Sequence, residues 1–389
     1  MRYSSSLAWA KQNLVKKAAF AFNANIDAIR GIEGKEIEAL VLPRELKGLP
    51  ETMRTGSGRE VLVSSRTLNF LNEVLGRDYT RIGGQVGNVA NAAAALGVDS
   101  YAHVTSKTRE QCELLNPRVK IALGNRFVCA SSIKDKGIAS VHFVLEFEGG
   151  DKIYGKNIPA SNRFIASYDP INFRMKIDPA FKRNILPKLK QIDRIILAGF
   201  HLLTHGNVRR KVREISALLR KWKKINKNLE IHLEMGEFQK RDALKLVLSD
   251  ILPLCDSLGI NETEVNQTAG LLKMKKEVLP VCRALLKRVP TVVFHRREYA
   301  FALSKKHGKE QLEHALRFGS ILAAYKAKYG KWGKFEELER YLKRAKIQKV
   351  KRSIPKNIAF VPSLLVTHPK ETVGLGDSFT VGYFLTRKK

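Results

Sequence analysis

The sequence contains few cysteines, no long hydrophobic run and far fewer acidic than basic residues. Its 389 residues include four cysteines without the paired spacing of a zinc site or a redox motif: Cys112, Cys129, Cys255 and Cys282. Scattered thiols in a chain of this length are typical of buried side chains in a reducing compartment. We therefore expect a cytoplasmic protein without disulfides.

The longest apolar stretches, such as residues 195–200, are much shorter than the roughly 18 residues of a membrane-spanning helix. They predict buried strands. An apolar content of 44% in a chain of this length predicts a large core and more than one compact unit. We expect no association with a membrane.

Residues 1–17 are amphipathic and basic and contain no acidic residue, as in a transit peptide. A core-like strand pattern at residues 18–22 follows at once, however. We therefore interpret the segment as a helix of the folded domain.

The shortage of acidic residues gives a net charge of +33 and an isoelectric point near 10.1. Such a charge attracts anionic ligands and, at low salt, nucleic acid. The basic clusters at residues 220–227, 273–276 and 343–352 are spread over and between predicted helices, without a zinc pattern, an RNP motif or a helix-turn-helix signature. We expect non-specific attraction and no specific nucleic-acid function.

Short apolar runs alternate with amphipathic helical stretches along most of the chain. Strands are predicted at residues 18–22, 100–104, 140–147, 194–197, 230–233, 257–260 and 291–295, and helices at 88–96, 207–225, 241–252, 262–272, 276–288 and 308–328. The alternation predicts a large α/β domain with a central, mostly parallel sheet, made of residues 1–29, 81–125 and 173–389. Residues 30–80 and 126–172 are richer in strand alternation and predict a small, discontinuous β-rich lid domain.

The most informative single motif is the glycine-rich turn TVGLGD at residues 372–377, ahead of an apolar helix at residues 379–385. Glycines allow backbone N–H groups to converge on an anion, and a helix N-terminus adds a positive dipole. A carboxylate there, Asp377, can take a proton from an attacking hydroxyl while the amides hold a phosphoryl group. Alternatively, Asp377 only caps the helix.

Further motifs follow in order along most of the chain: FNANIDAI at 22–29, GGQVGN at 83–88, ASNRFI at 160–165, LAGF at 197–200, HLE at 232–234 and NETE at 261–264. With the GLGD turn, they resemble the ribokinase-like superfamily and, within it, the ADP-dependent sugar kinases, glucokinase and phosphofructokinase, best known from archaea. The HLE and NETE motifs resemble the ADP-dependent branch rather than its ATP-dependent relatives. The chain is shorter than the resemblance implies, so we expect some lid or loop elements to be trimmed.

The resemblance implies a role for each matching residue. Asp377 is the catalytic base, Gly374 and Gly376 hold the transferred phosphoryl group, and Arg163 offsets its charge. The sugar-binding residues are Asn25, Asp27, Glu60, Gly83, Gly84 and Gln85. From residue patterns alone, Asn25 and Asp27 better fit an ordinary turn after a strand, and Arg163 better fits a surface arginine.

Glu234 and Glu264 are expected to hold Mg²⁺, partly through water, with ADP as the phosphoryl donor. Each follows a predicted strand, on the side of a doubly wound sheet where ligands bind. Glu264 also fits a capping box with Asn261, and His232 fits either a partner of Glu234 or a core histidine. The nucleotide-binding residues implied by the resemblance are Asn261, His295, Tyr299, Val366, Thr367, His368, Gly374, Leu375 and Gly376. For His295 and Tyr299, packing against neighbours is an equal alternative.

The resemblance implies transfer of the β-phosphoryl group of Mg-ADP to a sugar hydroxyl, with AMP as product. Glucose is favoured as acceptor, because Glu60 matches a glutamate of glucose-using members and residues 167–170 offer no cation for a sugar phosphate. Lys152 and Lys156 keep fructose 6-phosphate, or both acceptors, open. Two further interpretations are an ATP-dependent ribokinase-like sugar or nucleoside kinase and an inactive relative that binds RNA through its basic surface. We expect a monomer.

Overall fold

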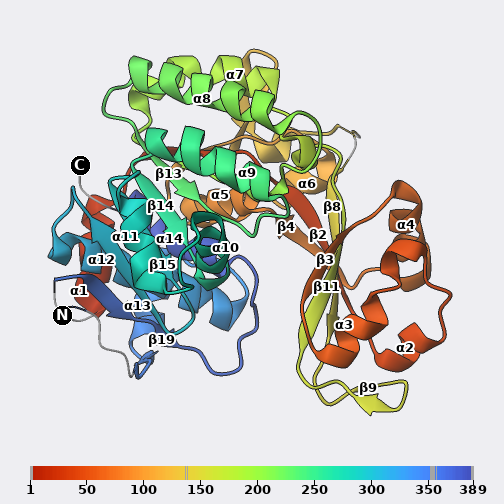
Figure 1. Cartoon of the computed structure of the whole chain (residues 1–389). Helices are drawn as coiled ribbons and strands as arrows, with labels where there is room; N and C mark the ends of the chain where they lie inside the picture. The colour runs from red at the N-terminus through yellow and green to blue at the C-terminus, as the bar shows by residue number, and fades with distance from the viewer. Residues whose placement is uncertain (1–2, 136, 138, 351–354, 356, 387–389) are drawn as a thin grey trace.

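The structure is a computed structural model that describes residues 3–135, 137, 139–350, 355 and 357–386. It contains a large α/β domain around a ten-stranded sheet and a smaller domain around a five-stranded sheet, on the right of Figure 1. The predicted fold class is confirmed. Within the described ranges, no helix has the length and apolar character needed to cross a bilayer.

The large sheet is parallel through its centre, from β15 to β6, and antiparallel at both edges. Its strands in spatial order are β18 (Ala359–Pro362), β16 (Tyr299–Ser304), β15 (Thr291–His295), β14 (Ser257–Ile260), β13 (Glu230–Glu234), β12 (Arg194–Leu197), β1 (Lys17–Ala21), β5 (Asp99–Ala102), β6 (Lys120–Leu123) and β7 (Arg126–Cys129). The central strands are apolar almost throughout because both of their faces are covered.

Helices cover both faces of this sheet, as doubly wound folds require. One face packs against α7 (Pro179–Asn184), α8 (Val208–Ile225), α9 (Arg241–Leu246), α10 (Glu262–Leu272) and α11 (Val278–Leu286). The other packs against α1 (Tyr3–Asn13), α5 (Gln85–Ala95), α6 (Arg109–Glu113), α12 (Lys309–Tyr329), α13 (Phe335–Leu342) and α14 (Leu375–Leu385). Helix α1 buries Leu7 and Ala10 against this core, so the prediction of a folded N-terminal helix is confirmed.

The small sheet has the order β3 (Arg59–Leu62), β11 (Asn162–Tyr168), β8 (Val141–Phe147), β2 (Asn25–Gly31) and β4 (Tyr79–Gly83). One face packs against α2 (Gly34–Glu38), α3 (Leu49–Thr55) and α4 (Ser65–Phe70). Alternate residues of a strand point to opposite faces. In β8, Phe143 and Leu145 therefore enter the apolar core, whereas His142 and Val144 face a cavity.

Three boundaries differ from those predicted. The small sheet includes residues 25–29 and 81–83, because β2 and β4 pair with each other and carry the chain between the domains. Strand β7 belongs to the large sheet, where it forms a hairpin with β6 around Gly124. The last helix begins at Leu375, with Gly374 as its N-cap residue in the left-handed conformation, φ 67°. Asp377 is therefore in the first turn of that helix and is not its cap.

Candidate active site

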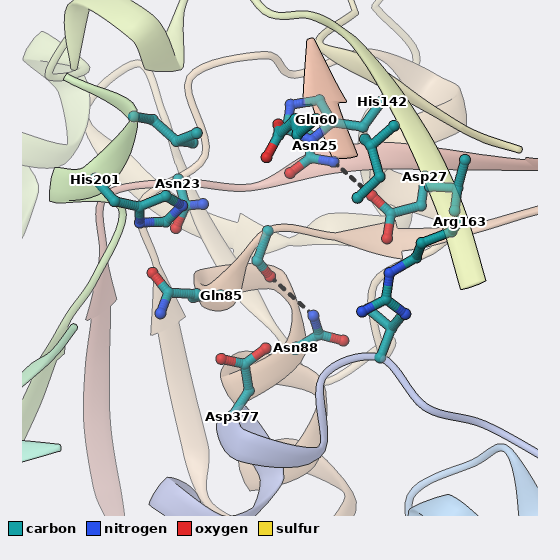
Figure 2. A pocket seen from close by; sticks show the side chains of 15 residues that line it. Asn23, Asn25, Asp27, Glu60, Gln85, Asn88, His142, Arg163, His201 and Asp377 are labelled. Carbon is teal, nitrogen blue, oxygen red and sulfur yellow. Dashed lines mark hydrogen bonds between the residues drawn. The ribbon is translucent and has the colours of Figure 1, made fainter. Parts of the chain in front are cut away.

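A cavity of about 180 Å³ lies where the polar face of the small sheet meets the edge of the large sheet. Figure 2 shows the side chains around it. The lining residues are Asn23, Asn25, Asp27, Glu60, Gly84, Gln85, Asn88, His142, Val144, Arg163, Ile165, His201, Leu202, Val373 and Asp377. The fold thus brings residues of several widely separated sequence motifs into one cavity.

Strand pairing sets polar side chains in a row on the small-sheet side of the cavity. In the register of the sheet, Asp27 lies between His142 of β8 and Arg81 of β4, and Ser167 of β11 lies opposite His142. The Asn25 Nδ2 atom donates to Asp27 Oδ1 at 2.8 Å. Such a row suits a ligand that carries several hydroxyl groups, because each hydroxyl needs a polar partner in a closed site.

His142 is charged beside this cavity because it pairs with a buried carboxylate. Its Nε2 atom donates to Asp169 Oδ2 at 3.2 Å. Burial alone would lower the pKa of His142, but the hydrogen bond to Asp169 and the charge of that carboxylate raise it to about 9. Glu60 also lines the cavity, and its Oε1 atom accepts from Ser167 Oγ at 2.7 Å. The His142 imidazolium and the Glu60 carboxylate therefore both face the cavity.

The GGQVGN motif brings the backbone close to these side chains. A Cβ atom on Gly83 would fall 2.0 Å from Asp27 Oδ1, so any larger residue there would displace the Asp27 and Asn25 side chains. Gly84 is the N-cap residue of α5, with φ 72°. The Gln85 side-chain amide bonds to the backbone just past two strands of the large sheet. Its Nε2 atom donates to the Met235 carbonyl at 2.6 Å, and its Oε1 atom accepts from the Gly199 N–H at 2.9 Å. Gln85 thus has a structural role besides lining the cavity.

Three polar atoms of the cavity wall are buried and have no hydrogen-bond partner among the described residues: Asn23 Oδ1, Asn25 Oδ1 and His201 Nδ1. Burial lowers the pKa of His201 to about 4, so its imidazole is neutral. Buried polar atoms in native proteins are nearly always hydrogen-bonded. Their clustering here points to a polar ligand that supplies the missing partners.

Asp377 lies across the cavity from this polar row (Figure 2). Its side chain is buried in the first turn of α14, where the helix dipole favours negative charge. Burial and then the nearby charge of Glu234 raise the pKa of Asp377 to about 7, against the opposing charge of Lys326. A carboxylate with a pKa near neutrality is suited to accept a proton in a reaction.

Lys326 of α12 lies directly behind the glycine turn. Its Nζ atom donates to Asn88 Oδ1 at 3.0 Å and lies 4.2 Å from the ring centroid of Trp332. A Cβ atom on Gly374 would come within 2.6 Å of that Nζ atom, so the turn needs glycine for this approach as well as for its φ angle. Burial lowers the pKa of Lys326 to about 8, against the effect of Asp377.

Arg163 of β11 reaches from the small sheet toward the glycine turn. Its Nη1 atom donates to Thr372 Oγ1 at 3.3 Å, and the side chain lines the cavity. The guanidinium therefore lies between the polar row of the small sheet and the glycine turn, and Figure 2 shows Arg163 beside Asp27. A guanidinium in this position can pair with an anion bound at the turn.

Glu234 is a buried carboxylate with three hydrogen-bond donors. His232 Nε2 and Thr380 Oγ1 donate to Oε2 at 3.0 and 2.7 Å, and His295 Nε2 donates to Oε1 at 3.2 Å. Burial alone would raise the pKa of Glu234, but the two histidine hydrogen bonds lower it to about 2. The alternative in which His232 orients Glu234 therefore agrees with the structure.

Glu264 forms the capping box of α10 with Asn261, as one of the two sequence interpretations predicts. Burial and then the charge of Glu234 raise the pKa of Glu264 to about 8. No group of three or more potential ligand side chains converges within the described ranges. The oxygens of Glu234 and Glu264 already accept protein hydrogen bonds, so a cation at this pair would be held through water rather than directly. A cation would also relieve the repulsion between the two carboxylates.

The predicted nucleotide-binding residues lie in different surroundings. His295 is beside the glycine turn and packs against Phe379, with ring centroids 5.1 Å apart. Tyr299 is buried and packs against Phe294 and Phe360, so the structure favours core packing over stacking on a base. Val366 is half-buried, Thr367 and His368 are exposed ahead of the turn, and Leu375 begins α14.

Six residues in or around the site are not predicted from the sequence: Asn23, Asn88, Arg81, His142, His201 and Lys326. Asn23 and Asn88 lie in the FNANIDAI and GGQVGN motifs, beside predicted site residues. Strand alternation could have placed His142 on the cavity face. Lys326 and Asn88 are 238 positions apart, and no local pattern indicates such a contact.

Residues 16–386 match the model of the ADP-specific phosphofructokinase/glucokinase conserved region. The ADP-dependent glucose/glucosamine kinase of Pyrococcus abyssi is 25% identical, over 96% of this chain and 94% of its own, and the ADP-specific phosphofructokinase of Thermococcus litoralis is 27% identical, over 94% of each.

In fold, this chain is similar to the crystal structure of a hypothetical ADP-dependent phosphofructokinase from Pyrococcus horikoshii. The two superpose with a TM-score of 0.82 at 22% identity, covering 96% of this chain and 98% of the other. The family model covers nearly the whole chain, including every motif described above. The chain belongs to the ADP-specific phosphofructokinase and glucokinase family, the ADP-dependent sugar kinases.

Proposed function

We propose that this chain is an ADP-dependent glucokinase that transfers the β-phosphoryl group of ADP to the 6-hydroxyl of glucose. In the step, the hydroxyl proton passes to Asp377 while the bond between sugar oxygen and β-phosphorus forms. The bond between that phosphorus and the bridging oxygen breaks, and AMP leaves with the electron pair. The products are glucose 6-phosphate and AMP.

The observation that carries the proposal is the arrangement across the cavity. A buried carboxylate with a pKa of about 7 faces a wall that holds three unpartnered polar atoms and the Asn25–Asp27 pair. A sugar against that wall presents a hydroxyl to Asp377. Proton abstraction then needs only one hydrogen bond between that hydroxyl and the carboxylate.

The phosphoryl group belongs at the glycine turn. The free N–H groups of the first turn of α14 and the helix dipole favour an anion at Gly374–Gly376, and Arg163 supports the same group from the other side. When bound through water to Glu234 and Glu264, Mg²⁺ supplies further neutralisation of phosphate charge. We assign Asn261, Val366, Thr367 and His368 to the nucleotide side by resemblance to the family, with His295 acting through Glu234.

Glucose is favoured as acceptor by the chemistry of the small-sheet face. Glu60 and His142 offer an acceptor and a donor for hydroxyl groups. A carboxylate at Glu60 also disfavours a sugar phosphate by repulsion. Lys152 and Lys156 are exposed on β9 (Lys152–Ile153) and β10 (Lys156–Asn157), which do not line the cavity described here.

Fructose 6-phosphate is the second candidate, because the charged His142 and Arg163 both face the cavity and can attract a phosphate. The curated relatives include both activities, a glucose/glucosamine kinase and a phosphofructokinase.

A panel of two donors and three acceptors tests the proposal. The purified chain is incubated with ADP or ATP, Mg²⁺ and glucose, glucosamine or fructose 6-phosphate, and products are followed by ³¹P NMR. We expect AMP and glucose 6-phosphate from ADP and glucose, with ATP a poor donor. A preference for fructose 6-phosphate would transfer the proposal to the second candidate. Absence of turnover with every pair would contradict both.

A further inference from the structure

Two arginines of the small sheet contact successive residues just ahead of the glycine turn. Arg81 of β4 donates from Nη1 to Glu371 Oε2, and Arg163 of β11 donates to Thr372 Oγ1 at 3.3 Å. The two sheets are thus joined at the segment that leads into Gly374. Arg163 has a proposed role at the phosphoryl group, whereas Arg81 does not line the cavity.

Arg81 also contacts the sugar side of the site. It lies opposite Asp27 in the β2–β4 register, and its Nε atom is 3.6 Å from Asp27 Oδ2. The Asp27, Arg81 and Glu371 side chains are 9%, 17% and 10% exposed, respectively. Ion pairs this far out of water are costly to break on one side, unlike exposed pairs. One guanidinium therefore joins a proposed sugar ligand, Asp27, to Glu371.

Glu371 in turn fixes the backbone that leads into the turn. Its Oε1 atom accepts from the backbone N–H groups of Thr372 and Val373, each at 2.8 Å. The N–H groups of Lys370 and Glu371 donate to the Ala327 carbonyl near the end of α12. The next residue is Gly374, so the place of the Glu371 carboxylate determines where the phosphoryl-binding amides lie.

We propose that Arg81 is a positioning residue that couples the sugar site to the phosphoryl turn, so that each substrate tightens binding of the other. Sugar bound at Asp27 immobilises Arg81 and, through Glu371, the turn. The nucleotide then binds a turn that is already ordered, and the reverse holds equally. This inference rests on the proposed function, because it places the sugar at Asp27 and the β-phosphate at the turn.

The coupling is measured as the ratio of the glucose Kd without nucleotide to that with saturating α,β-methylene-ADP and Mg²⁺, a donor that cannot transfer its phosphoryl group. Isothermal titration of the full chain gives this ratio for the wild type, R81Q, E371Q and the double variant. We expect a ratio of about 5 or more in the wild type, within the usual range of coupled sites, and a ratio near 1 in each variant. The double variant should give the same ratio as each single variant, because R81Q and E371Q remove the same Arg81–Glu371 ion pair.

E371Q keeps the shape of the side chain and an oxygen for the Thr372 and Val373 amides, so it tests the ion pair even where R81Q is poorly folded. R77Q is the matched control. It breaks another ion pair between the domains, Arg77 to Glu110 at 2.6 Å, which is exposed and away from the cavity, and it should retain the wild-type ratio.

A wild-type ratio of 1, or an unchanged ratio in R81Q and E371Q, would overturn the inference while leaving the proposed function intact. Failure of the wild type to bind glucose at all would instead contradict the proposed acceptor, and the coupling with it.

Discussion

Replacing Lys326 by methionine should move the pH dependence of the reaction without removing any group that touches a substrate. Lys326 is buried behind the glycine turn, and its charge is the largest favourable charge acting on Asp377. Methionine fills a similar volume and removes that charge. The pKa of Asp377 should therefore rise.

The size of the effect follows from the surroundings of the two groups. A nearby opposite charge lowers a carboxyl pKa by about 1 to 3. Lys326 ranks behind burial and Glu234 among the influences on Asp377, so we take the lower limit, which places the pKa of Asp377 in K326M at about 8. At pH 7, a base with pKa about 7 is about half ionised and one with pKa about 8 about one-tenth ionised, so the rate should fall about fivefold.

The loss should disappear at high pH for two reasons. Asp377 is ionised in both proteins at pH 9, and the pKa of Lys326 is itself lowered to about 8, so the wild type loses the charge there too. The assay is kcat/KM for the sugar, with saturating ADP and Mg²⁺, between pH 6 and 9.5. The control is K328M, an exposed lysine two residues further along α12. This reasoning would be refuted if kcat/KM in K326M began to fall, as the pH is lowered, at the same pH as in the wild type or at a lower pH.

Two further predictions concern the small-sheet side of the site. E60Q should raise the KM for glucose about 10- to 100-fold, because a charge-assisted hydrogen bond to the sugar is weakened, and should leave the KM for ADP unchanged; equal changes in both constants would speak against a sugar contact. D169N should destabilise the fold by about 3 kcal/mol at pH 6 in urea titrations, because it breaks the buried pair with His142. The folded pKa of His142, about 9, lies above its unfolded value, so this stability is complete below about pH 6.5 and is lost as the pH rises through 9. A gap between D169N and the wild type that stays constant from pH 6 to 9.5 would show that the pair is not ionic.

The fold class was predictable from the sequence, and several predicted site residues line the cavity, because many of them lie near the ends of buried strands. Asn25, Glu234 and Asn261 lie at or just past strand ends of the sheets, and strand ends are recognisable from apolar runs. The glycine turn was recognisable because a positive φ angle and close backbone approach at Gly374 admit little else.

The residues that escaped prediction act through contacts between distant parts of the chain. Arg81 and Glu371 are 290 positions apart and are ordinary surface-type residues in sequence. Tyr299 illustrates an alternative that the sequence leaves open, because an aromatic side chain after a strand fits base stacking and core packing equally. Only the positions of Phe294 and Phe360 decide between them.

The account depends on Asp377 as the group that takes the proton from the sugar, and D377N tests this most directly. The asparagine keeps the size of the side chain but cannot act as a base. With ADP, Mg²⁺ and the acceptor that the wild type uses, single-turnover formation of AMP should fall about a thousandfold, while the Kd for α,β-methylene-ADP stays within about threefold. Turnover by D377N within tenfold of the wild-type rate would contradict the account.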